Sequence, residues 1–168
     1  MAGTVNLNSD PVGPSGPPGD PEPRILLRCR DIVDALPIPH PFDVDVFRTA
    51  LEAHRSRRLV LTAASLPPPC TGLWAASQST DYIFYRRDAT PAEQLRAISH
   101  EIGHMTLGHR GMQVPASEFA RLLFAHLDPH KVAAALALVP VVARYSESEE
   151  AEAETFASVF LQQIRDTA

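Results

Sequence analysis

The chain has 168 residues, of which 45% are hydrophobic and 21% charged, and its formal net charge at pH 7 is −5. This length fits one domain with one apolar core, and a negatively charged chain has no general attraction for the phosphate backbone of nucleic acids. No stretch approaches the ~18 consecutive apolar residues that are needed to cross a bilayer, so a membrane-spanning function is not expected.

Residues 1–23 are rich in proline and glycine. Such a segment has almost nothing to bury, so its ordering is not compensated. We therefore expect a disordered tail over 1–23 and a single domain over 24–168. The start of the chain has no basic region followed by an apolar run, which is not typical of a secretory signal. With only two cysteines, Cys29 and Cys70, this favours reduced thiols and a cytoplasmic location.

Two helices and three strands are predicted before residue 90. The first helix covers about 24–36 and ends at Pro37. The second begins near Asp43 and has apolar residues at helical spacing. The three strands are apolar or rich in aromatic and β-branched residues, and they cover Leu59–Thr62, Gly72–Ala76 and Asp81–Tyr85. Their short connections favour an antiparallel meander.

A helix with clear boundary signals follows. Thr90 can cap its first turn, Pro91 suits the first helical position, and Glu93 can complete a capping box. Gly108 is a typical helix end. After a loop over 111–115, helices are expected near Phe119–Phe124, over Pro129–Ala143 and over Ser146–Arg165. These elements predict an α+β domain that is mostly helical.

The pattern His100-Glu101-Ile102-Gly103-His104 lies inside the helix that Thr90 caps. Four residues turn a helix by about 400°, so both imidazoles project from one face. That arrangement lets two ring nitrogens bind one zinc ion. Glu101 is offset by about 100°, so it can flank the metal and accept a proton from water. This spacing on a helix is the signature of zinc peptidases.

A catalytic zinc site requires a third protein ligand. His109 is close in sequence, but it stands nine residues after His100, whereas the metzincin pattern requires ten. We therefore interpret His109 as a loop histidine.

The acidic run Glu147–Glu154 is the better source of a third ligand. Glu150 and Glu154 share a predicted inward stripe with Ala153 and Ala157, and inward carboxylates are costly unless they are paired. We expect Glu150 to bind the metal and Glu154 to orient a ligand histidine from outside the coordination sphere. Glu149 is the alternative metal ligand, and Glu152 points to the flank.

Together, His100–His104, the segment Glu150–Ala157 and the strand before the zinc helix resemble the ImmA/IrrE metallopeptidase family over about Arg24–Ile164. The resemblance implies a zincin-like domain of the gluzincin type, with a small three-stranded antiparallel sheet beside the zinc helix. It also implies a zinc-dependent endopeptidase that cleaves a regulatory protein, such as a helix-turn-helix repressor encoded nearby. Compared with the family pattern, the chain carries extra residues near 116–143.

The sequence predicts a mechanism in which Glu101 is the general base. The strand Asp81–Tyr85 either pairs with an extended substrate or is a plain sheet edge. Tyr145, His109 and Tyr85 are candidates for stabilising the oxyanion. The alternative function is a protein that sequesters a regulator without cutting it, as in a toxin–antitoxin module.

Overall fold

The computed structural model describes residues 22–66, 68–76, 79–110, 112–114 and 141–166. Within them the chain is an α+β protein with four helices and five strands. The expected tail lies outside the described residues except for its last two positions, and so do the helix predicted near Phe119–Phe124 and most of the helix predicted over Pro129–Ala143. No helix in the described part is both long and apolar enough to cross a membrane.

The first helix begins and ends close to the predicted positions, and the second begins where it was predicted to begin. Helix α1 covers Pro23–Asp34, and α2 covers Val44–Arg55. Asp43 caps α2 because its carboxylate accepts hydrogen bonds from the backbone N–H groups of Asp45 and Val46, both at 2.9 Å. The helices predicted from the spacing of apolar residues in these two segments are therefore confirmed.

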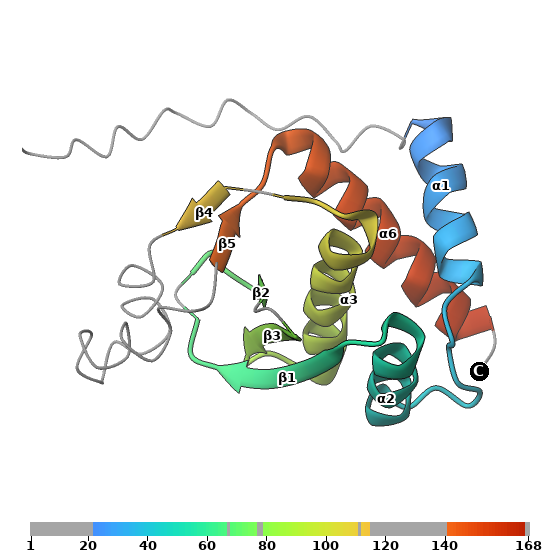
Figure 1. The fold of residues 1–168 in the computed structure, drawn as a ribbon, viewed down its shortest axis with the longest axis horizontal. Helices are drawn as coiled ribbons and strands as arrows, with labels where there is room; N and C mark the ends of the chain where they lie inside the picture. The colour runs from blue at the N-terminus through green and yellow to red at the C-terminus, as the bar shows by residue number, and fades with distance from the viewer. Residues whose placement is uncertain (1–21, 67, 77–78, 111, 115–140, 167–168) are drawn as a thin grey trace, which may run out of the picture.

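Helix α3 covers Pro91–Leu107 and forms as its boundary residues predict. Thr90 and Glu93 make both halves of a capping box, and Gly108 ends the helix in the left-handed conformation, with φ 76°. The last helix, α6, covers Glu147–Asp166. In Figure 1, α3 lies between the sheet and α6, and α1 packs against α6.

The three predicted strands are present, but their predicted arrangement is wrong. They are β1 (Arg58–Ala64), β2 (Gly72–Ala76) and β3 (Thr80–Arg86). The sheet is mixed, because β3 pairs with β1 in parallel and with β2 in the antiparallel sense. In the sheet, β3 lies between β1 and β2. The segment that joins β1 to β3 along the chain contains β2, so it is long enough to connect two parallel strands.

Two further strands extend the sheet beyond β2. They are β4 (Met112–Val114) and β5 (Val141–Arg144), and the order across the sheet is β1-β3-β2-β5-β4. Residues 141–143 were predicted to end a helix, which is wrong: β5 pairs with β2 at Ala75 and with β4 along its length. Whether such a short segment with β-branched residues forms a strand depends on its pairing with a neighbouring strand, and this pairing cannot be seen in a single sequence.

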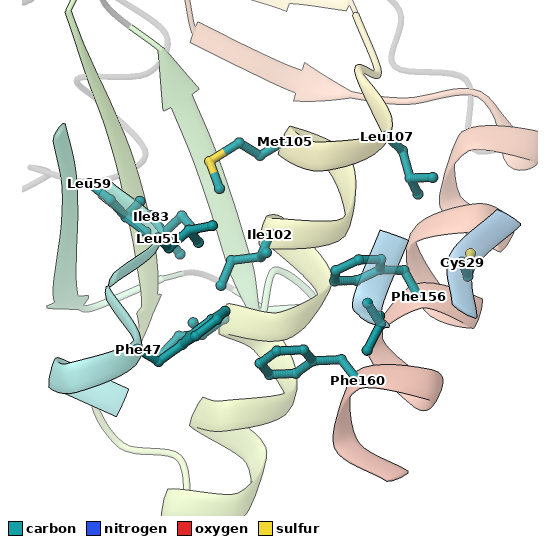
Figure 2. Packing of buried hydrophobic residues seen from close by; sticks show 12 residues of the cluster. Cys29, Phe47, Leu51, Leu59, Ile83, Ile102, Met105, Leu107, Phe156 and Phe160 are labelled. Atoms are coloured by element: carbon teal, nitrogen blue, oxygen red, sulfur yellow. The ribbon is translucent and has the colours of Figure 1, made fainter. Parts of the chain in front are cut away.

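The core lies on both sides of α3. Figure 2 shows Ile102 and Met105 directed from α3 toward Leu59 and Ile83 of the sheet. From α6, Phe156 and Phe160 pack against the opposite side of α3. Helix α3 is therefore held between two apolar layers, and this packing fixes the position of the residues that it carries.

Candidate metal centre

Helix α3 carries the three residues that the sequence singled out, and it holds them firmly. His104 and Glu101 are buried, with 1% and 5% exposure, whereas the His100 side chain is 22% exposed. Burial of His104 lowers the pKa of its imidazole, because the interior disfavours the charged form. A neutral imidazole is the form that binds metals.

Glu150 of α6 lies beside both imidazoles. Its Oε2 atom is 3.1 Å from Nε2 of His100 and 3.7 Å from Nε2 of His104, and the two Nε2 atoms are 3.0 Å apart. These contacts hold the pKa of the Glu150 carboxyl well below its usual range, so it is ionised. Three groups able to donate lone pairs therefore face one point between α3 and α6.

The donor set fits a zinc ion. With bonds of ~2.0–2.1 Å, the ligand atoms around a tetrahedral zinc ion lie ~3.3–3.4 Å apart, and the three observed separations of 3.0, 3.1 and 3.7 Å bracket that value. Two histidines and one glutamate also form one of the usual protein ligand sets of catalytic zinc. The residues present would thus need only small shifts to hold the ion.

Glu149, the alternative ligand, performs a different task. Its Oε2 accepts hydrogen bonds from the N–H and hydroxyl groups of Ser146, each at 2.9 Å, and its Oε1 accepts one from the N–H of Arg110 at 3.2 Å. The backbone N–H of Glu149 donates in turn to Ser146 Oγ at 3.3 Å. Glu149 therefore caps the first turn of α6 and does not lie among the three facing groups.

Glu101 lies against β2. Its carboxylate accepts a hydrogen bond from the backbone N–H of Trp74, and burial raises its pKa to about 7, while the nearby His100 opposes the rise. Gly72 leaves room for it: a Cβ atom at this position would lie 2.8 Å from Glu101 Oε1. The glycine thus permits a close approach of strand and carboxylate that no other residue would allow.

Tyr145 covers His104 on the side of β5. The two rings are stacked, with centroids 3.5 Å apart and planes 14° apart. The hydroxyl group is buried and has no hydrogen-bond partner among the described residues. Burial and the nearby Glu101 and Glu150 raise its pKa well above the usual range, so it keeps its proton and remains a hydrogen-bond donor.

Each histidine also has a neighbour at its second nitrogen. Nδ1 of His100 lies 3.6 Å from Oε2 of Glu154. The other carboxylate oxygen of Glu154 pairs with Arg96. Nδ1 of His104 lies 2.9 Å from Nδ1 of His109. His109 does follow the helix as predicted, but it is buried at 8% exposure and contacts the site.

The predicted inward stripe of α6 is wrong in part. Ala153 and Ala157 are fully buried, but the side chains of Glu150 and Glu154 are 49% and 48% exposed. Glu152, which was assigned to the flank, is the more buried carboxylate, at 18% exposure. The reason is that Glu150 and Glu154 border an open cleft, whereas Glu152 lies between α6 and α1.

The three facing groups open into a cleft of about 930 Å³. Glu101, Tyr145 and Glu154 line it together with the strand β2 and the first turns of α3. The thiol of Cys70 also lies here, but it donates to the carbonyl oxygen of Gly72 at 3.1 Å. The strand β3 does not border the cleft as an edge, because β1 and β2 flank it. The prediction that β3 offers a free edge is therefore wrong.

Two of the candidates for oxyanion stabilisation differ clearly in position. Tyr145 lines the cleft beside the two imidazoles, whereas Tyr85 packs against the apolar core.

Comparison of the sequence with models of known protein families and with curated proteins found no match.

Proposed function

We propose that this chain is a zinc-dependent endopeptidase of the ImmA/IrrE type, with a zincin-like arrangement around α3. The observation that supports the proposal is the convergence of His100, His104 and Glu150 in the lining of a cleft that Glu101 also lines. A purely structural zinc site is closed by four protein ligands, whereas a catalytic one keeps a position open. Among the described residues, only these three form such a group, which favours catalysis.

Glu101 and Tyr145 each have a chemical role in the proposed reaction. When bound, zinc supplies a Lewis acid that acidifies water and polarises the scissile carbonyl group. Glu101 takes the proton of the attacking water and returns it to the leaving amine. The hydroxyl group of Tyr145 donates a hydrogen bond to the oxygen that becomes negative in the transition state.

Strand β2 is the element best placed to bind an extended peptide. Its residues Gly72, Leu73 and Trp74 line the cleft, and among the described residues β5 is paired with β2 at Ala75 alone. A peptide could therefore add backbone hydrogen bonds to groups in this part of β2 other than the N–H of Trp74, which already donates to Glu101. We propose a cytoplasmic regulatory protein, such as a repressor encoded nearby, as the substrate.

The test combines metal content with cleavage. Purified protein should contain one zinc per chain by elemental analysis, and His104→Ala should lose it, whereas His54→Ala, at an exposed histidine, should keep it. Glu101→Gln should keep the zinc and lose cleavage of the neighbouring repressor, or of a proteome-derived peptide library read by mass spectrometry. Glu147→Gln, at an exposed carboxylate, is the matched control.

Three results would contradict the proposal. Zinc content unchanged in His104→Ala would mean that the metal lies elsewhere. Full cleavage by Glu101→Gln would remove Glu101 from the reaction. If the wild-type protein instead copurifies with an uncut regulator and cuts no peptide in the library, the chain is a binding protein and the peptidase proposal fails.

A further inference from the structure

The metal centre is connected to α1 through a chain of polar contacts. His104 contacts His109 through their two Nδ1 atoms, 2.9 Å apart. Nε2 of His109 lies 3.5 Å from Oε2 of Glu152, and the same oxygen accepts a hydrogen bond from Arg28 at 2.9 Å. Arg28 is itself fixed, because its second terminal nitrogen donates to the carbonyl oxygen of Leu107 at 3.1 Å.

The backbone places His109 in this position. Gly108 turns the chain at the end of α3 in the left-handed conformation, and the backbone N–H of His109 then donates to the carbonyl oxygen of His104 at 3.0 Å. The ring of His109 is thereby folded back against that of His104, with centroids 5.0 Å apart. Both rings are buried, so solvent does not compete for their contact.

The direction of the hydrogen bonds follows from the charge at the end of the chain. The Nδ1–Nδ1 contact needs one donor and one acceptor. A carboxylate only accepts, so Glu152 favours the tautomer of His109 with a proton on Nε2. Nδ1 of His109 then accepts the proton of His104 Nδ1, which leaves Nε2 of His104 unprotonated and directed at Glu150 and His100.

We propose that His109 is a positioning residue for the metal ligand His104, with Glu152 and Arg28 setting its tautomer. This inference rests on the proposed zinc site. His104 would bind zinc through Nε2 because His109 holds both its ring orientation and its tautomer. Outer partners of this kind raise the basicity of a ligand imidazole, and their loss typically costs 10–100-fold in metal affinity.

The test measures zinc affinity by competition with a chromophoric chelator, at a temperature at which circular dichroism shows the metal-free variants to be folded. His109→Leu should weaken zinc binding by roughly 10–100-fold. His109→Gln should weaken it less, since the amide oxygen can accept the His104 proton. The control His54→Leu makes the same change at an exposed histidine and should have no effect. In parallel, two-bond ¹H–¹⁵N spectra should show His109 protonated on Nε2 with and without zinc.

The outcomes separate this inference from the proposed function. If the wild type binds one zinc and His109→Leu binds it equally tightly, the positioning role is wrong and the zinc site stands. If His109→Leu and His109→Gln lose the same zinc affinity, a hydrogen-bond acceptor at this position has no effect, and the inference is overturned. A proton on Nδ1 of His109 also overturns it. A wild type that takes up no zinc overturns both the site and the inference.

Discussion

Tyr145 combines two features that a single substitution can separate. Its ring stacks on His104, and its buried hydroxyl group lacks a partner among the described residues. Tyr145→Phe keeps the stacking and removes only the hydroxyl group. We expect cleavage to slow by ~10²-fold or more, as on loss of one oxyanion donor, with zinc affinity unchanged. Because the hydroxyl makes no hydrogen bond with any described residue, the free energy of unfolding should not fall. Peptide kinetics, chelator competition and thermal unfolding measure the three quantities.

Tyr85→Phe is the matched control for this prediction. Tyr85 lies on β3 and packs against the core, so the same change there should leave cleavage unaltered. A Tyr145→Phe variant with wild-type cleavage would show that the hydroxyl group does not contact the reacting carbonyl.

The sequence predicted which residues come together more completely than it predicted their outer partners. Two histidines four residues apart share a helix face whatever the rest of the fold does, and Glu150 was chosen from spacing on α6. His109 was interpreted as a loop histidine and a candidate for stabilising the oxyanion, because its spacing from His100 does not fit the metzincin pattern. The missed signal was Gly108: a left-handed residue at a helix end reverses the chain, so the next side chain returns toward the last turn.

At the scale of the elements, the site depends on the contact between α3 and α6. Gly103 permits this contact, because a Cβ atom there would lie 3.0 Å from the Phe156 ring and 3.2 Å from the backbone of Ala153. Gly103→Ala should push the two helices apart and move Glu150 away from the imidazoles. We expect zinc affinity to fall at least tenfold, although alanine favours the helix by about 1 kcal/mol. Chelator competition and denaturant unfolding measure the two effects separately.

The zinc affinity of Gly103→Ala tests whether the close packing at this glycine helps to build the site. Zinc affinity unchanged in Gly103→Ala would mean that α6 can yield without moving Glu150, and the close packing would then have no part in building the site. The paired variant Gly103→Ala with Phe156→Leu reduces the bulk beside the new methyl group and should recover part of the affinity.

Asp81 joins three elements at the end of β3. Its carboxylate is 1% exposed and accepts from Arg55 at 2.5 Å, from Arg57 at 2.8 Å and from the indole N–H of Trp74 at 3.1 Å. Asp81→Asn should lower the free energy of unfolding by about 2–3 kcal/mol, below the ~3–5 kcal/mol of a fully buried pair because both guanidinium groups are about a quarter exposed. Urea unfolding gives the value.

Asp88→Asn is the control for Asp81→Asn. Asp88 pairs with Arg86 in a contact that solvent screens, since Asp88 is 69% exposed, and its loss should change stability little. Equal effects of the two substitutions would show that Asp81 is not a structural anchor.

The sheet shows where prediction from sequence stopped at this scale. The strands β1, β2 and β3 were found because their apolar and β-branched residues are local signals. Their order was missed because it depends on the pairing of β1 with β3, which are not consecutive strands. The strand β5 was missed because its partners, β4 and Ala75 of β2, lie far away in sequence. Local propensity contains neither piece of information.

In the whole molecule, the proposed zinc site lies where α3 and α6 meet. The apolar contacts of α3 with the sheet and with α6 do not involve the metal ligands, so the metal-free protein should fold. The proposed site has its three ligands assembled only in the folded form, so zinc at ~100 times the dissociation constant should add ~2.7 kcal/mol to the free energy of unfolding. For a domain of this size that corresponds to a rise of about 5–10 °C in Tm, measurable by calorimetry after removal of metal with a chelator.

Alanine substitutions at Glu150 and Glu149 should have opposite effects on the metal-free Tm and on its zinc-dependent rise. Glu150→Ala removes a proposed ligand from the cleft, so its metal-free Tm should stay near that of the wild type while the zinc-dependent rise is lost. Glu149→Ala removes the carboxylate half of the capping box at the start of α6, so its metal-free Tm should fall while the zinc-dependent rise remains. If Glu149→Ala instead loses the rise and Glu150→Ala keeps it, then Glu149 leaves Ser146 to bind the ion, and α6 must begin differently in the zinc-bound protein.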